Sequence, residues 1–322
     1  MQGKVMTEDA MSPVYVGIDV CKERLDVYLH PLGEHFSVAN DAAGRRSLVR
    51  RLAKRRVELV VMEPTSKYHR AAQRHLDSVG IAVALFNPYR ARRFAEAYGQ
   101  LAKTDRIDAR ILALAGERLQ LDPARPLSAE AEALEELAGA RSAALAERVA
   151  VANRLGTTGS AYLRRELGTW LRSLDRRVSR IEAKIAEMIA ADPVLVRRAA
   201  IIRSIPGMGP VNVLAILTGL REIDRIDGKE ATALAGLAPF ADDSGPRQGR
   251  RRIRGGRADL RKALYMAAVA ASRCNPDLKS FYQRLRASGK PAKLALIAVA
   301  RKLVVLANTL IIQDRCWTPL RP

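Results

Sequence analysis

The first 118 residues alternate between short apolar runs and segments of helical pattern, and this alternation most constrains the fold. VYVGIDV and RLDVYL are β-branched or alternate apolar with polar residues, as strands do, and the later runs VELVVME and IAVALFN each end just before a proline. The expected strands are two within residues 14–29, one at 57–63 and one at 81–87, with helices at 41–56 and 68–79. Strands that alternate with helices predict a layered α/β domain over residues 14–118.

The rest of the chain has a helical pattern. LDPARPL, at residues 121–127, contains two prolines and predicts a linker. Residues 128–156 are rich in Ala, Glu and Leu and predict a long helix, and a second one follows the interruption TTGS. The second helix carries a heptad seam: Leu167, Leu171, Leu174, Val178, Ile181, Ile185 and Met188. The seam packs either within its own domain or in an antiparallel hairpin or coiled coil that joins protomers. We expect a helical coiled-coil linker over residues 128–190 and a mainly helical domain over 195–315.

The charge of the chain is strongly positive and unevenly distributed. It has 55 Lys and Arg residues against 34 Asp and Glu, a formal net charge of +21. Residues 191–322 hold 24 of the basic and 10 of the acidic residues, so this segment carries 14 of the 21 net positive charges. Such an excess indicates a polyanionic partner, and nucleic acid is the leading candidate.

Several other classes of protein are disfavoured. The three cysteines are far apart and form neither a disulfide framework nor a CxxC pair, and the four histidines form no zinc motif. Residues 1–13 have no apolar core of a signal peptide. The most apolar stretch, residues 294–312, has Arg301 and Lys302 at its middle, which predicts a buried amphipathic helix rather than a membrane span. We expect a reduced, cytoplasmic protein with no membrane partner.

Four carboxylates are candidates for a metal site. Asp19 lies at the end of the first expected strand and Glu63 at the end of the third, while Asp105 and Asp108 are spaced i, i+3 on one face of a helix. Two-metal sites need several carboxylates on one patch, and Mg²⁺ prefers oxygen ligands. The spacing alone is also compatible with solvated carboxylates, or with Asp108 paired to a neighbouring arginine.

A serine in a basic, glycine-rich segment is the second candidate. Ser244 precedes eight basic residues opposed by Asp259 alone: Arg247, Arg250, Arg251, Arg252, Arg254, Arg257, Arg261 and Lys262. Glycines let a backbone approach a phosphate, and arginine forks fit phosphate oxygens. A serine held there is a candidate nucleophile for a phosphodiester, although it needs a base or a nearby metal. The alternative is a basic loop that binds the nucleic-acid backbone while Ser244 only caps a turn.

A third element is the sequence IPGMGP at residues 205–210, which precedes an expected helix. A PGxG turn of this kind resembles the hairpin of helix-hairpin-helix modules, whose exposed N–H groups bind phosphate without reading sequence. Gly207 and Gly209 would make these backbone contacts, and Lys103, just before the acidic helix, is a further candidate for nucleic-acid contact. A plain turn between helices is the alternative.

These motifs together resemble those of one protein family. GIDVCKERLDV, MEPTSKY and KTDRIDAR are similar to the RuvC-like nuclease domain of the insertion-sequence one-ten family of transposases. The family's Asp-Glu-Asp-Asp quartet maps on Asp19, Glu63, Asp105 and Asp108, and the resemblance implies Mg²⁺ as their ion. Segments from SIPGMGP to ARKL resemble the family's C-terminal transposase domain, in which the nucleophilic serine maps on Ser244. The resemblance covers residues 14–118 and 195–312.

The resemblance implies a DNA transposase or recombinase that works through a phosphoserine intermediate with Mg²⁺. It also implies donor and target DNA as partners, an RNA encoded by the element that bridges them, and a homo-oligomer, a dimer or a dimer of dimers, with a site composite between protomers. Such a protein would be associated with the bacterial nucleoid while it acts. Two alternatives remain from the residues alone: a structure-specific endonuclease that uses only the carboxylates and water, and a non-catalytic nucleic-acid-binding protein.

Overall fold

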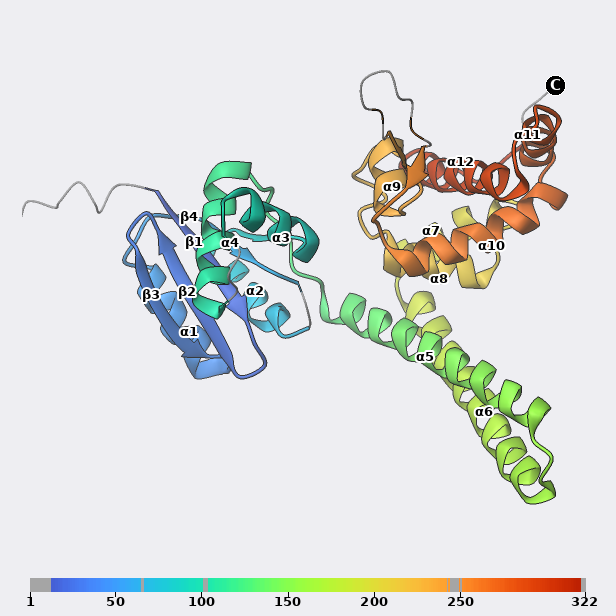
Figure 1. The fold of residues 1–322 in the computed structure, drawn as a ribbon, viewed down its shortest axis with the longest axis horizontal. Coiled ribbons are helices and arrows are strands. Elements are labelled where there is room, and N and C mark those ends of the chain that lie inside the picture. Colours follow the sequence, from blue (N-terminus) through green and yellow to red (C-terminus); the bar gives the residue numbers. More distant parts are fainter. Residues whose placement is uncertain are drawn as a thin grey trace, which may run out of the picture. The chain divides into compact units, whose positions relative to one another are not determined.

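The computed structural model describes residues 13–64, 67–100, 104–241, 243, 249 and 251–319 (Figure 1). It divides into two compact units, Met1–Ser128 and Ala129–Pro322, and each is described by itself. The first unit is mixed α/β and the second is built mainly from helices.

The first unit contains a five-stranded sheet in the order β3-β2-β1-β4-β5. β1 pairs with β2 and β2 with β3 in antiparallel fashion, while β1 with β4 and β4 with β5 are parallel. The strands are β1 (Val14–Val20), β2 (Arg24–His30), β3 (Glu34–Ala39), β4 (Val57–Met62) and β5 (Val83–Leu85). Four of them lie where the sequence pattern predicts strands, and β3 was not predicted.

Helices cover both faces of this sheet (Figure 1). The helices are α1 (Ala42–Leu52), α2 (His69–Asp77), α3 (Pro88–Ala97) and α4 (Asp105–Leu119). Leu48 and Leu52 of α1 and Leu76 of α2 pack on one face with Ile18 of β1. Leu112 of α4 packs on the other face with side chains of β4 and α3. Side chains of a strand alternate between faces, so β1 contributes to both cores.

α4 lies directly on β1 because of a glycine. A Cβ atom on Gly17 would stand 1.9 Å from the Ala109 carbonyl oxygen and 2.5 Å from the Ala113 backbone nitrogen. A Cβ atom on Gly116 of α4 would stand 2.8 Å from the side chain of Val61 on β4. Two glycines, one on the sheet and one on the helix, therefore allow the close contact that fixes α4 over β1 and β4.

The second unit begins with a helical hairpin. α5 (Ala129–Thr157) and α6 (Ala161–Ala191) run antiparallel, since Arg141 pairs with Glu182 while Arg148 pairs with Asp175. The residues of the predicted seam are all buried or half-buried, and Leu174, Val178 and Ile185 are the most buried, at 3%, 8% and 6% exposure. The seam therefore packs against α5 of the same chain.

The remaining helices form a compact apolar core. They are α7 (Pro193–Ser204), α8 (Pro210–Gly219), α9 (Gly228–Leu234), α10 (Ala258–Cys274), α11 (Pro276–Ala287) and α12 (Ala292–Ile312). α7, α8 and α11 each begin with a proline, whose fixed φ suits the first helical position. Within the described residues, α12 is the one helix that is long and apolar enough to cross a membrane. Nine of its residues are buried in this core and Arg301 and Lys302 are exposed, as predicted for a core helix with an amphipathic pattern.

Candidate active site

Three elements of the first unit place the four predicted carboxylates at one end of the sheet, where the strands β1 and β4 end. β1 and β4 are parallel neighbours with Ile18 opposite Met62, so Asp19 and Glu63, the next residues, lie at the same end. Asp105 is the first residue of α4 and Asp108 lies one turn further on. Because Gly17 holds the later turns of α4 against β1, the first turn of α4 lies beside the end of that strand.

The electrostatics of Asp19 reflect this crowding. Burial, as the largest cause, and then the charges of Asp108, Asp105, Glu63 and Asp26 together raise the pKa of the Asp19 carboxyl to about 6. Both causes act in the same direction, because loss of water and each added negative charge near Asp19 disfavour its ionised form. This end of the sheet therefore has a high density of negative charge, which favours the binding of a cation.

A thiol that was not predicted lies in the same place. One ligand atom from each of Asp19, Cys21 and Asp105 lies within 4.8 Å of the other two. Burial and the charges of Asp19 and Asp105 raise the pKa of the Cys21 thiol, so the sulfur keeps its proton at neutral pH. The sequence carried one signal for it, because Cys21 follows Asp19 by two residues and strand periodicity places such residues on one side.

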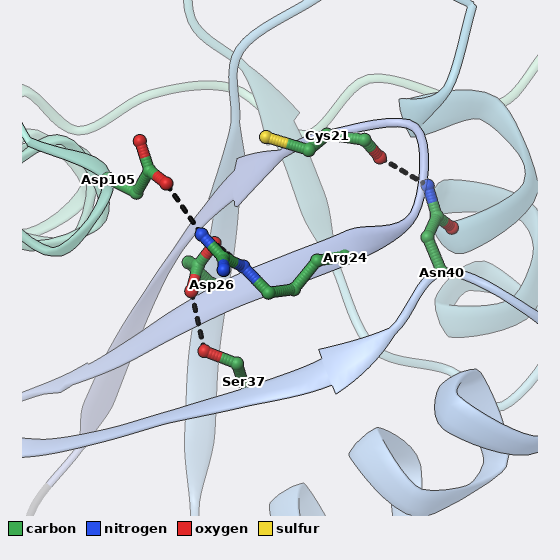
Figure 2. A network of polar contacts seen from close by, with 6 residues as sticks. All are labelled: Cys21, Arg24, Asp26, Ser37, Asn40 and Asp105. Carbon is green, nitrogen blue, oxygen red and sulfur yellow. Dashed lines mark hydrogen bonds and ion pairs between the residues drawn. The ribbon is translucent and has the colours of Figure 1, made fainter.

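A polar network on β2 and β3 contacts the site and was also not predicted (Figure 2). Arg24 donates from Nε to Asp26 Oδ2 at 2.7 Å and from Nη2 to Asp105 Oδ2 at 2.6 Å. The hydroxyl of Ser37 donates to Asp26 Oδ1 at 2.5 Å. Asn40 donates to the carbonyl of Cys21 at 2.9 Å and so holds the turn that follows β1.

The predicted serine lies outside the described residues, as do Arg247, Arg250 and Lys103. The strands β6 (Pro239–Phe240) and β7 (Arg252–Ile253) flank the segment that contains Ser244, and they pair in antiparallel fashion. Asp243 accepts a hydrogen bond from the Gly249 N–H at 3.1 Å and pairs with Arg251 at 2.9 Å. The pairing of β6 with β7 and the contacts of Asp243 therefore connect the residues before this segment with those after it.

Besides Arg251, two of the predicted phosphate-binding arginines have partners inside the protein. Arg257 makes a bidentate ion pair with Glu222, with N–O distances of 2.8 and 2.7 Å, and also donates to the Gly219 carbonyl at 2.9 Å. Burial alone would raise the pKa of Glu222, but the hydrogen bonds and charge of Arg257 lower it below its usual value. Arg261 donates to the Gly255 carbonyl at 2.7 Å. Arg257 and Arg261 therefore stabilise the C-terminal part of the basic segment through contacts within the protein.

The other described basic residues of that segment are exposed: Arg251, Arg252, Arg254 and Lys262. The segment therefore combines two bracing arginines with side chains that reach solvent. The distinction was not visible in the sequence, because Glu222 lies 35 residues before Arg257.

The glycines of the IPGMGP turn have different roles. Gly207 has a φ of +100°, and a Cβ atom there would stand 2.7 Å from Ala271, so the turn between α7 and α8 packs closely on α10. Gly209 is the N-cap of α8, and nothing lies within 4 Å of the position its Cβ would take. Gly207 is thus required for packing, whereas backbone contact with phosphate at Gly209 stays a prediction.

Comparison with known proteins identifies the class of protein that carries this site. A family model described as "Transposase" matches residues 16–158, and one described as "Transposase IS116/IS110/IS902 family" matches residues 199–283. The chain is 26% identical over 315 residues to the pilin gene-inverting protein of Moraxella bovis, with 95% of this chain and 98% of that protein covered. It is 25% identical to a probable family 20 transposase of Pseudomonas aeruginosa, with 94% and 98% covered.

A shorter match is 31% identical over 164 residues to the insertion element IS116 uncharacterized 44.8 kDa protein of Streptomyces clavuligerus, covering 49% of this chain and 39% of that protein. The matches define a transposase, a class of enzyme that acts on DNA. More particularly, the chain belongs to the IS110 family, the insertion-sequence one-ten family indicated by its motifs.

Proposed function

We propose that this transposase cleaves and rejoins DNA strands through a covalent phosphoserine at Ser244, with Mg²⁺ held by Asp19, Glu63, Asp105 and Asp108. The observation that carries the proposal is the convergence of carboxylates: ligand atoms of Asp19 and Asp105 lie within 4.8 Å of each other, and burial together with the neighbouring carboxylates raises the pKa of Asp19 to about 6. A divalent cation is the ligand that relieves such repulsion. The donors are carboxylate oxygens, which Mg²⁺ prefers, so the residues fit this ion.

We further assign the first unit to the RuvC-like class of nuclease domains. Support comes from the mixed sheet, in which β1 is central and the acidic residues follow the parallel pair β1 and β4. Further support comes from α4, whose first turn adds two more carboxylates at the same end of the sheet.

In the proposed reaction Ser244 Oγ attacks the scissile phosphorus while the bond from phosphorus to the 3′ oxygen breaks. The serine loses its proton and the released 3′ oxygen gains one, so a phosphoserine and a 3′-hydroxyl result. The 3′-hydroxyl of a partner strand then attacks the phosphoserine, which restores both the serine and a phosphodiester bond. Asp19, Glu63, Asp105 and Asp108 would hold the Mg²⁺, which would supply stabilisation of the charge on the phosphate oxygens. The exposed Arg251, Arg252 and Arg254 bind neighbouring phosphates.

The proposed partners follow the family resemblance. They are donor and target DNA, a guide RNA encoded by the element, and further copies of the chain, in a dimer or a dimer of dimers. The carboxylates of one protomer meet the serine of another in this arrangement, at the nucleoid in the cytoplasm. An enzyme that leaves sequence reading to base pairing needs backbone contacts above all, and the 55 Lys and Arg residues with only 5% aromatic residues suit that mode.

The test is to incubate the full chain with end-labelled donor and target DNA, with and without element RNA, and to trap adducts on a denaturing gel. Wild type should form a protein–DNA adduct, and Ser244→Ala should lose adduct and strand exchange but retain DNA binding. Ser179→Ala, a change to an exposed serine on α6, is the matched control and should behave as wild type. Cleavage that persists in Ser244→Ala, with no adduct in wild type, would instead establish the metal-dependent endonuclease.

A further inference from the structure

We propose that Arg24 is an internal cation that holds Asp105 while the metal site is empty and that releases Asp105 when a divalent ion binds. The proposal rests on the metal site of the proposed function and adds a positioning residue to it. It starts from one guanidinium group shared by two carboxylates, one of which belongs to the acidic quartet (Figure 2).

The two carboxylates that share Arg24 differ in exposure. The side chain of Asp26 is 5% exposed, and that of Asp105 is 51% exposed. Asp26 also lies on β2 directly opposite Asp19, so the shared guanidinium lies at the same end of the sheet as the acidic quartet. Arg24 is thus anchored in the sheet at Nε and reaches the first turn of α4 with Nη2.

The anchored end is the stronger of the two contacts. Asp26 is buried and accepts a second hydrogen bond, from Ser37 on the adjacent strand β3. A buried carboxylate deprived of its cation leaves an uncompensated charge, and that loss is severe. An ion pair between side chains that are each half-exposed is weak, because water screens it. The contact with Asp105 therefore breaks before the contact with Asp26.

A divalent ion competes with this weaker contact. Mg²⁺ binds carboxylate oxygens at about 2.0–2.1 Å, and Oδ2 of Asp105 already accepts from Arg24 at 2.6 Å. Binding through the second oxygen of Asp105 would not avoid the competition, because an ion bound there would lie within a few ångström of the guanidinium and the like charges would repel. Arg24 consequently lowers the affinity of the site for a divalent ion until its Nη2 moves away.

The test measures binding of Mn²⁺ alone to the full chain, from the electron paramagnetic resonance signal of the free ion. Arg24→Met removes the competing charge and should lower the Kd for Mn²⁺ by about fivefold, the upper range expected for an exposed ion pair. Arg55→Met is the matched control. Arg55 pairs with Glu34 at 2.7 Å in the same unit, so this change removes the same charge from another exposed pair and should leave the Kd unchanged.

A second variant guards against misfolding, since Arg24→Met leaves the buried Asp26 without its cation. The double change Arg24→Met with Asp26→Asn removes that burden and leaves the net charge as it was, and it should also bind Mn²⁺ more tightly than wild type. An unchanged or higher Kd in both variants overturns the proposal, because Arg24 would then have no effect or would help to hold the ion.

Asp19→Asn separates this proposal from the metal site itself. If Asp19→Asn abolishes Mn²⁺ binding while the Arg24 variants fail to tighten it, only the role of Arg24 is refuted. If Asp19→Asn leaves Mn²⁺ binding unchanged, or if no variant binds Mn²⁺, both the metal site and the role of Arg24 are refuted.

Discussion

The substitution Gly17→Ala tests how the carboxylate site is assembled. Its new Cβ would lie 1.9 Å from the Ala109 carbonyl oxygen, so α4 has to retreat by about 1.5 Å to reach the 3.4 Å of ordinary contact. Overpacking of this kind costs about 1–3 kcal/mol of unfolding free energy. The movement also carries Asp105 and Asp108 away from Asp19, and a misplacement of about 1 Å at a reacting centre typically costs about 100-fold in rate.

The assays are thermal unfolding and adduct formation with end-labelled DNA. Gly17→Ala should lower the unfolding temperature and reduce adduct formation by about 100-fold. Gly139→Ala is the control, because Gly139 lies inside α5 with nothing within 4 Å of its Cβ position. This control should stabilise the helix by about 0.5–1 kcal/mol and leave adduct formation unchanged. Wild-type activity and stability in Gly17→Ala would refute the idea that close packing at β1 sets the site.

Two further predictions concern the acidic site and the hairpin. The pKa of Asp19 is raised from 3.8 to about 6, so the folded state binds more protons than the unfolded state in this range and its stability falls as pH rises from about 4 to 6. Asp19→Asn should therefore raise the unfolding temperature more at pH 7 than at pH 4.5, both measured in EDTA, and an equal gain at the two values would contradict the shift. Val178 is 8% exposed in the seam against α5, so Val178→Glu should destabilise the hairpin by about 2 kcal/mol or more, seen as a lower unfolding temperature by circular dichroism. The mass by light scattering should stay that of wild type; a lower mass would show that the seam joins protomers, and Ser179→Glu on the exposed face is the control.

Strands with a buried face were predictable from sequence, and the edge strand β3, which has none, was not. β1 and β4 carry fully buried residues such as Val16 and Val60, so their apolar runs are distinct. β3 has the sequence EHFSVA and no fully buried residue, and its apolar side chains Phe36 and Val38 are only half-buried. A strand of this kind has little apolar signal, and its position depends on pairing with β2.

The site divides in the same way. The positions of Asp19 and Glu63 were predictable because each lies at the end of a predicted strand. The helical spacing of Asp105 and Asp108 placed those two side chains on one face of a helix. Arg24 was not predictable as their neighbour, because its contact with Asp105 spans 81 residues of sequence and depends on where α4 lies on the sheet. The pairing of Arg257 with Glu222 likewise depends on tertiary structure, so counting basic residues overstated how many reach solvent.

The antiparallel hairpin of α5 and α6 makes an arm of defined length. Leu134 and Ile185 pack with Leu214 of α8 at its base, and the turn between the helices lies about 24 residues from Ile185, or about 36 Å at the rise of an α-helix. A seam with a seven-residue repeat keeps its register when both helices lose or gain one whole heptad. The reach of the arm is therefore adjustable in steps of about 10 Å, with the core at its base unchanged.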